Sequence, residues 1–146
     1  MQTTEALVLE VKRVLSAPAE RVFAAWTSAA SLKRFITPGN PGHADVECDA
    51  RVGGRFRIDM HGKDGKVFRH DGEFLEVDPP RRLKFSWISD ATNHRATIVT
   101  IDFKPQGEKT EVTLVHEGLD SVKSVQGHTT GWTAILEQQE VVSSER

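Results

Sequence analysis

The apolar positions in the last part of the chain recur with a helical period. Between Leu119 and Val142, apolar residues and one histidine fall three or four residues apart: Val122, Val125, His128, Trp132, Ile135 and Leu136. This spacing predicts one stripe on a long helix, for which Asp120 or Ser121 can supply the N-cap. Gly131 is expected to let another backbone approach the helix. A single helix cannot bury such a stripe alone, so we expect the rest of the chain to pack against it.

Most of the preceding chain alternates between apolar and polar residues, which is typical of strands. Strands are predicted at about residues 7–12, 43–48, 55–61, 67–77, 83–87, 96–104 and 110–116. After the first strand, Ser16 can cap and Pro18 can begin one short helix, and Ser28 can begin another. Residues 38–42, Pro-Gly-Asn-Pro-Gly, are expected to form a loop.

This order of elements predicts an α+β fold. We expect a curved antiparallel sheet of six or seven strands around the long C-terminal helix, with two short helices after strand 1. A sheet that curves around a helix can leave a cavity between the two. The pattern points to such a cavity without naming what it holds.

The charges of residues 55–61 and 67–77 select a register for the hairpin that these strands form. A three-residue loop at positions 63–65, with Asp64 at the tip and Gly65 left-handed, places three pairs of opposite charge on one face. These pairs are Arg55–Glu73, Arg57–Asp71 and Asp59–Arg69. A two-residue slip would oppose like charges instead, so the pairs agree on one register although each is worth only ~0.2–1 kcal/mol.

The same register decides which side chains share the other face of the hairpin. They are Phe56, Ile58, Met60, Phe68, His70 and Phe74. If this face is concave, His70 points into the space beneath the long helix, where burial is expected to lower its pKa. Two registers are open where residues 67–77 meet residues 83–87. One places Phe74 opposite Phe85, and the other pairs Glu76 with Lys84 but needs Leu75 to share a face with Phe85. A β-bulge near residues 74–75 would reconcile the two.

Composition narrows the classes of protein. A chain of 146 residues is most simply one domain, residues 1–146. Its 19 basic and 21 acidic residues are dispersed, which argues against nucleic acid as a partner. Cys48 is the one cysteine, so no internal disulfide can form. No signal-peptide pattern or membrane-spanning apolar run is present, so we expect a cytoplasmic protein without membrane insertion.

Several stretches, taken in order, resemble one known family. They are residues 13–18 (RVLSAP), 22–27 (VFAAWT), 52–56 (VGGRF), 72–83 (GEFLEVDPPRRL), 85–87 (FSW), 110–114 (TEVTL), 116–119 (HEGL) and 131–132 (GW). The set resembles the activator of heat-shock protein 90 ATPase homologues, a branch of the START-like (SRPBCC) superfamily that also includes polyketide cyclases. The resemblance implies a helix-grip fold and a ligand-sized cavity, and it implies no particular reaction.

Two departures from the family pattern change the expectation. Residues 34–38 read Arg-Phe-Ile-Thr-Pro where the family usually has adjacent tryptophans followed by Gly-Pro, so the cavity mouth is expected to differ in shape. Residues 137–140 read Glu-Gln-Gln-Glu where the family has an apolar run, so the long helix is expected to bury less at its C-terminal end.

Eleven residues are candidates for lining the cavity: Trp26, Phe56, Ile58, Met60, His70, Phe74, Phe85, Trp87, His116, His128 and Trp132. The histidines can orient a ligand or exchange protons with it, or they can be core residues satisfied by backbone and water. The tryptophans are packing residues first. No histidine pair has metal-site spacing, and no phosphate loop, dinucleotide motif or Ser-His-Asp order is present. We therefore expect no metal and no cofactor, and we assign no catalytic residue.

Three classes of function remain open. The first is a binding module that holds a small hydrophobic molecule in the cavity. The second is an enzyme of cyclase, aldolase or hydrolase type that uses the same cavity. The third is an interaction protein, either a chaperone-regulating domain or a homodimer. A smooth apolar cavity favours binding, converging polar groups favour an enzyme, and an outward apolar patch favours interaction.

Overall fold

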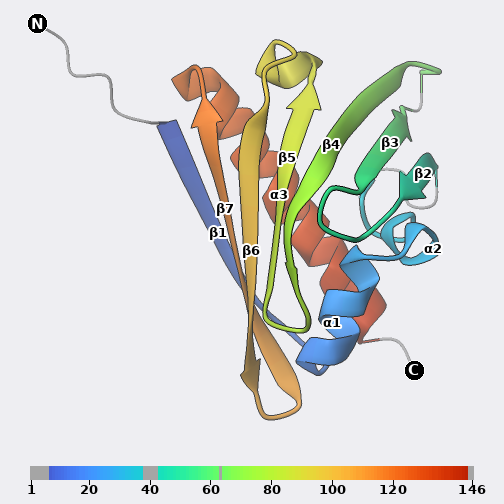
Figure 1. Cartoon of the computed structure of the whole chain (residues 1–146), viewed down its shortest axis with the longest axis vertical. Coiled ribbons are helices and arrows are strands. Elements are labelled where there is room, and N and C mark those ends of the chain that lie inside the picture. Colours follow the sequence, from blue (N-terminus) through green and yellow to red (C-terminus); the bar gives the residue numbers. More distant parts are fainter. Residues whose placement is uncertain (1–6, 38–42, 63, 145–146) are drawn as a thin grey trace, which may run out of the picture.

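The computed structural model describes residues 7–37, 43–62 and 64–144, and in these ranges it shows a seven-stranded antiparallel sheet with three α-helices (Figure 1). The strands are β1 (Leu7–Leu15), β2 (Ala44–Cys48), β3 (Arg55–His61), β4 (Val67–Asp78), β5 (Arg82–Ser89), β6 (Thr97–Gln106) and β7 (Lys109–Leu119). The helices are α1 (Ala19–Trp26), α2 (Ala29–Leu32) and α3 (Val122–Ser143), with a 3-10 turn, η1 (Asp90–Thr92), after β5. The predicted loop at residues 38–42 lies outside the described ranges.

The strand order β1-β7-β6-β5-β4-β3-β2 follows the chain except that β1 pairs with β7. Figure 1 shows α3 crossing one face of the curved sheet, with α1 beside its C-terminal end. This confirms the predicted helix-grip architecture. None of the described helices has the length and apolar character needed to cross a membrane.

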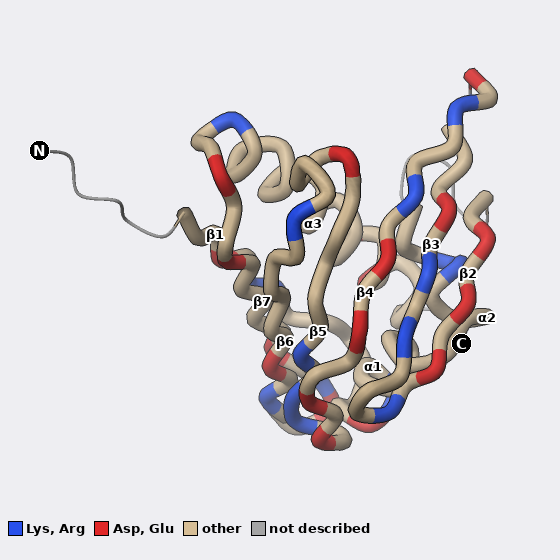
Figure 2. The backbone as a smooth tube through the Cα atoms, turned by 45° about the horizontal axis from the view of Figure 1, so that its top comes forward, with Lys and Arg blue, Asp and Glu red and all other residues tan. Residues whose placement is uncertain are grey.

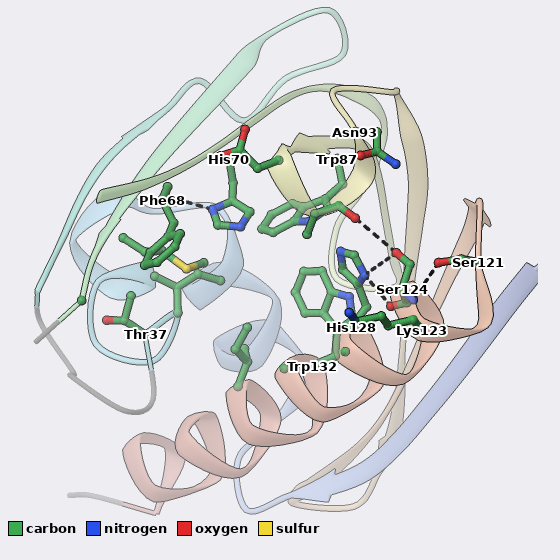
Figure 3. A pocket seen from close by; sticks show the side chains of 18 of the residues that line it. Thr37, Phe68, His70, Trp87, Asn93, Ser121, Lys123, Ser124, His128 and Trp132 are labelled. Carbon is green, nitrogen blue, oxygen red and sulfur yellow. Dashed lines mark hydrogen bonds between the residues drawn. The ribbon is translucent and has the colours of Figure 1, made fainter. Parts of the chain in front are cut away.

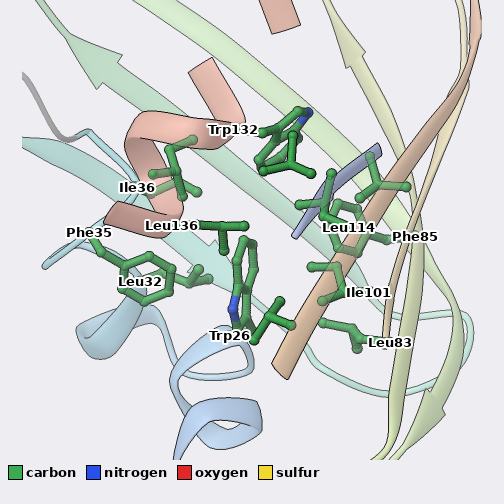
Figure 4. Close-up of a cluster of buried hydrophobic side chains, with 14 of the residues drawn as sticks. Trp26, Leu32, Phe35, Ile36, Leu83, Phe85, Ile101, Leu114, Trp132 and Leu136 are labelled. Carbon is green, nitrogen blue, oxygen red and sulfur yellow. The ribbon is translucent and has the colours of Figure 1, made fainter. Parts of the chain in front are cut away.

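The core lies between the concave face of the sheet and the helices (Figure 4). Every second residue is buried along β5, residues 97–103 of β6 and residues 110–116 of β7, which is the period that the sequence displays. Trp26 of α1 and Trp132 of α3 meet over this face, with ring centroids 6.3 Å apart. The two helices and the sheet thus share one core.

The predicted hairpin register is confirmed. Its three charge pairs lie directly across β3 and β4: Arg55–Glu73, Arg57–Asp71 and Asp59–Arg69. Gly65 has a φ of +86°, as the loop type requires, whereas residue 63 lies outside the described ranges. The predicted β-bulge also occurs, because the β4–β5 register shifts between Phe74 and Glu76.

The ion pairs on this face are partly diagonal. Arg57 Nε lies 3.5 Å from an Asp59 oxygen and 3.6 Å from a Glu47 oxygen of β2, instead of pairing with Asp71. Asp59 also accepts from Arg69 Nε at 2.8 Å, and this hydrogen bond lowers the pKa of the carboxyl. Figure 2 shows the basic positions of β3 between the acidic positions of β2 and β4. The outward face of this part of the sheet is therefore charged.

The start of α1 differs from the prediction. Pro18, not Ser16, is the N-cap of α1, because its carbonyl oxygen accepts from the amides of the first turn. Ser16 instead donates through Oγ and N to the Glu140 carboxylate, at 2.7 and 2.8 Å. The predicted cap at Ser28 is confirmed, since its side chain accepts from the Ser31 amide.

The prediction for the long helix is wrong on four points. The helix begins at Val122 with Ser121 as N-cap, and Leu119 still belongs to β7. Val122 is 62% exposed and is not part of the buried stripe. No atom lies within 4 Å of a Cβ built on Gly131, so no backbone approaches there. The C-terminal end is the better buried end, with Gln139 fully buried.

Candidate functional site

A cavity of about 1250 Å³ lies between the sheet and the N-terminal part of α3 (Figure 3). Its walls come from the β3–β4 hairpin, β5 with η1, the residues after α2, and one face of α3. The larger apolar side chains that line it are Ile36, Met60, Phe68, Trp87, Trp132 and Ile135. Ile36 and Thr37 thus occupy the wall where the family pattern departs.

The eleven candidate residues divide between this cavity and the core. Five line the cavity: Met60, His70, Trp87, His128 and Trp132. Trp87 also borders a void of about 20 Å³, together with five deeper candidates: Trp26, Phe56, Ile58, Phe74 and Phe85. Phe56 packs against the rings of Phe85 and Trp87 at 5.3 and 6.0 Å, so aromatic side chains fill this deeper space. His116 lines neither space.

His70 reaches the cavity from β4. Its ring lies against the Trp87 indole, with centroids 4.8 Å apart, and Nδ1 is 3.2 Å from the Phe68 carbonyl oxygen. A carbonyl oxygen only accepts, so Nδ1 carries the proton of the neutral ring and Nε2 keeps its lone pair. Burial lowers the pKa of His70, against the opposing effects of the Phe68 and Ile58 backbones. The ring is therefore neutral at pH 7 and presents Nε2 as an acceptor.

His128 faces the same cavity from α3. Its Nδ1 is 2.8 Å from the Ser124 carbonyl oxygen one turn earlier, so Nδ1 is again the protonated nitrogen of the neutral ring. Ser124 Oγ lies 3.3 Å from this nitrogen and donates to the Ala91 carbonyl oxygen at 3.2 Å. Because Nδ1 already holds a proton, it cannot take one from Ser124. The pair is not arranged as the nucleophile and base of a hydrolase.

His116 lies behind Trp132 and is fully buried. Trp132 Nε1 donates to His116 Nδ1 at 3.0 Å, so the ring proton is on Nε2. Nε2 donates to Thr97 Oγ1 at 2.7 Å, and that hydroxyl donates to the Trp87 carbonyl oxygen at 2.6 Å. Burial, together with the charge of His128, lowers the pKa of His116 to about 3. This histidine is a satisfied core residue that ties α3 to the sheet.

Two glycines that the sequence reasoning did not connect to the cavity belong to its wall. Gly127 and Gly131 both line it, four residues apart on one face of α3. At each position, no atom lies within 4 Å of where a Cβ would stand. Two glycines at helical spacing inside a predicted helix were the signal that could have found them, because glycine is a poor helix former.

The mouth of the cavity carries charges of both signs. Asp120 accepts from Asn93 Nδ2 at 2.6 Å and lies 4.0 Å from Arg95, while Asp90 lies 2.7 Å from His94. Lys123 lines the same end. These side chains were not among the predicted residues, because η1 and the start of α3 meet only in the folded chain.

The described residues form neither a metal-binding cluster nor a reactive thiol. Within the described ranges, no three His, Cys, Asp or Glu side chains gather in a way that could hold a metal ion. Cys48 lies on β2 and does not line the cavity. Burial, with the neighbouring charge of Asp49, raises the pKa of its thiol to about 11, so the thiol is a poor nucleophile at pH 7.

Relationships to known proteins appear in both sequence and fold. The family model described as Activator of Hsp90 ATPase homolog 1-like protein matches residues 16–142. Protein CV1439 from Chromobacterium violaceum is 26% identical, with 95% of this chain and 98% of that chain covered and a TM-score of 0.83. A protein from Arthrobacter aurescens, at 23% identity, covers 100% of this chain and 91% of its own with a TM-score of 0.82.

CalU16 from Micromonospora echinospora has the same fold at 22% identity and a TM-score of 0.75, over 95% of this chain and 77% of that chain. A search of curated proteins found no match. The family model covers most of the chain, and the curved sheet around α3 is the architecture that it implies. The chain therefore belongs to the Activator of Hsp90 ATPase homolog 1-like family, within the START-like (SRPBCC) superfamily.

Proposed function

We propose that this domain binds a small, largely apolar molecule in the cavity beneath α3. The observation that carries the proposal is the pair of glycines in the cavity wall. Glycine inside a helix costs about 0.5–1 kcal/mol relative to alanine, and a tight backbone contact usually explains it. Here Gly127 and Gly131 face open space, so their effect is to keep volume in the cavity.

The lining supports the same proposal. Ligand sites are mostly apolar and carry a few polar groups that orient the ligand. Trp87 and Trp132, with ring centroids 4.9 Å apart, supply flat apolar surfaces, and His70 and His128 supply the polar groups. The volume of about 1250 Å³ is somewhat above the usual range of roughly 300–1000 Å³ for ligand pockets. A ligand of drug size would fit without rearrangement of the sheet.

One feature favours an enzyme as the second candidate. A neutral His70 with Nε2 free to accept a proton has the form of a general base inside an apolar cavity. Turnover of a bound molecule, followed by mass spectrometry and lost in His70→Phe, would support this candidate over simple binding. Recovery of every ligand unchanged would support the binding module.

The test is to fill the cavity from the glycine positions. Gly127→Leu/Gly131→Leu places two side chains into the open space and should weaken binding of the neutral fluorescent probe N-phenyl-1-naphthylamine by tenfold or more. The thermal midpoint should not fall, because leucine is the better helix former. Thr133→Leu, at an exposed position of the same helix, is the matched control and should bind as the wild type does. Absence of binding by the wild type, or unchanged binding by the double variant, would contradict the proposal.

A further inference from the structure

The two histidines of the cavity wall share one hydrogen-bonding character. His70 Nδ1 is committed to the Phe68 carbonyl oxygen and His128 Nδ1 to the Ser124 carbonyl oxygen. Both rings therefore carry their proton on Nδ1 when neutral, and both keep the lone pair on Nε2. Among the described residues, the close hydrogen bonds of both rings are made at Nδ1, although the Ile58 backbone also acts on the pKa of His70. The cavity thus presents two Nε2 atoms that no close hydrogen bond from the protein occupies.

The two rings come from opposite walls. His70 stands on β4 and His128 on α3, and Figure 3 shows both beside the Trp87 and Trp132 indoles. Burial lowers the pKa of His70, so the acceptor form of this ring persists near pH 7. A molecule lying on the indoles would have an acceptor near it on each side.

We infer that the cavity selects neutral molecules that carry hydroxyl or N–H donors on a flat apolar body, such as phenols and other hydroxylated aromatics. This inference rests on the proposed binding function and specifies its ligand class. A ligand with a donor group can form a hydrogen bond to the lone pair of an Nε2 atom. A ligand with acceptors alone leaves that lone pair desolvated and unpaired, which is the costly arrangement. A carboxylate also adds a negative charge next to the lone pairs.

Lys123, a cation in the cavity wall, favours ligands of the opposite class, those that carry a negative charge. Lys123 lines the exposed end of the cavity and could pair with a carboxylate. A comparison of ligands must therefore separate donor recognition by the histidines from ion pairing at the mouth. Lys123→Gln removes the charge and leaves both imidazoles in place.

The experiment compares three probes on the same ring system: 2-naphthol, 2-methoxynaphthalene and 2-naphthoate. Binding to the full chain is measured by isothermal titration calorimetry near pH 7. The naphthol should bind between about fivefold and a hundredfold more tightly than the methyl ether, the span expected for one buried hydrogen bond. The naphthol should also bind more tightly than the naphthoate. The difference between these two affinities should be larger in Lys123→Gln, which cannot pair with the carboxylate.

Variants then assign the preference to the histidines. His70→Phe and His128→Phe should each reduce the ratio of naphthol to ether affinity, and the double variant should bring it near one. Affinity for the ether should change by less than about threefold, which shows that the cavity is intact. His43→Phe, at an exposed position outside the cavity, is the matched control and should keep the full ratio.

The outcomes separate the inference from the function on which it rests. If none of the probes binds, the proposed binding function fails and the inference falls with it. If the ether and the naphthol bind equally, or the carboxylate binds most tightly in Lys123→Gln, the cavity binds apolar molecules but does not select donors. If the ratio survives in the double histidine variant, another group recognises the donor.

Discussion

The inward histidines show how identical residues acquire different roles at the residue scale. In the sequence, His70, His116 and His128 are equivalent candidates. In the structure, both ring nitrogens of His116 have protein partners, whereas His70 and His128 each use only Nδ1. The interpretation as a satisfied core histidine therefore applies to His116. The other two retain the nitrogen that a ligand could use.

The burial of His116 predicts that the stability of the protein depends on pH. Its folded pKa of about 3 lies below the ordinary value of 6.5, so the folded state binds fewer protons than the unfolded state between these values. Stability is therefore full above pH 6.5 and is lost as the pH falls toward 3. Between about pH 7 and about pH 5, the wild type should lose about 2 kcal/mol more of unfolding free energy than His116→Gln, which does not titrate.

Urea denaturation of both proteins across this range is the measurement. The carboxylates and other histidines titrate in both proteins, so the difference isolates His116. Parallel curves for the wild type and His116→Gln would show that the ring takes up protons in the folded state as readily as in the unfolded one.

At the scale of elements, α3 is two different half-helices. Its C-terminal half is buried against the core and contains Trp132, Ile135, Leu136 and Gln139. Its N-terminal half is a cavity wall with glycine at positions 127 and 131. The same apolar period runs through both halves, because periodicity reports which face a residue occupies and not what covers that face.

The glycine pair predicts that α3 can be stabilised. Gly127→Ala and Gly131→Ala should each raise the free energy of unfolding by about 0.5–1 kcal/mol, because alanine favours the helix and each Cβ would meet open space. Gly107→Ala is the matched contrast. It also meets no atom within 4 Å, but its φ of +67° makes alanine strained, so this change should destabilise. Chemical denaturation measures all three, and destabilisation by the helix substitutions would show that the open space has another occupant.

At the scale of the whole molecule, polar contacts close the fold at the C-terminal end of α3. Gln139 accepts from Trp26 Nε1 at 2.9 Å and donates to the Val22 carbonyl oxygen at 3.3 Å. Glu140 accepts from Ser16. Within the polar run at residues 137–140, Gln139 therefore docks on α1 and Glu140 binds Ser16, which precedes α1, while Glu137 is exposed. A polar side chain can be buried wherever its hydrogen bonds are completed.

Trp132 connects α3 to α1 and to β5, so we expect its removal to lower the stability of the protein strongly. Its ring packs against Trp26 and Trp87, and its Nε1 bonds to His116. Trp132→Ala should lower the free energy of unfolding by ~3–5 kcal/mol, as for other large aromatic deletions in cores. Val122→Ala on the same helix, where the side chain is exposed, should change it by less than about 0.5 kcal/mol. A similar denaturation midpoint for both variants would show that the sheet holds together without this packing.

Several features follow from the sequence because they depend on near neighbours. The alternation of residues in β5, β6 and β7 marks their buried face, and the charges of β3 and β4 select one register. The bulge after Phe74 follows from two pairs that cannot otherwise form together. Each of these requires only a strand and the strand beside it. The order of strands and helices could be predicted for the same reason, because each element follows from the pattern of nearby residues.

Other features are decided only when distant segments meet. Ser16 gains Glu140 as a partner across 124 residues, and Trp26 gains Gln139 across 113. His116 becomes a core residue behind Trp132, whereas His70 and His128 face the cavity. Periodicity specifies the face of each side chain, but the cavity is the volume left after all faces have packed. That volume depends on every contributing segment at once, so the tertiary structure alone determines it.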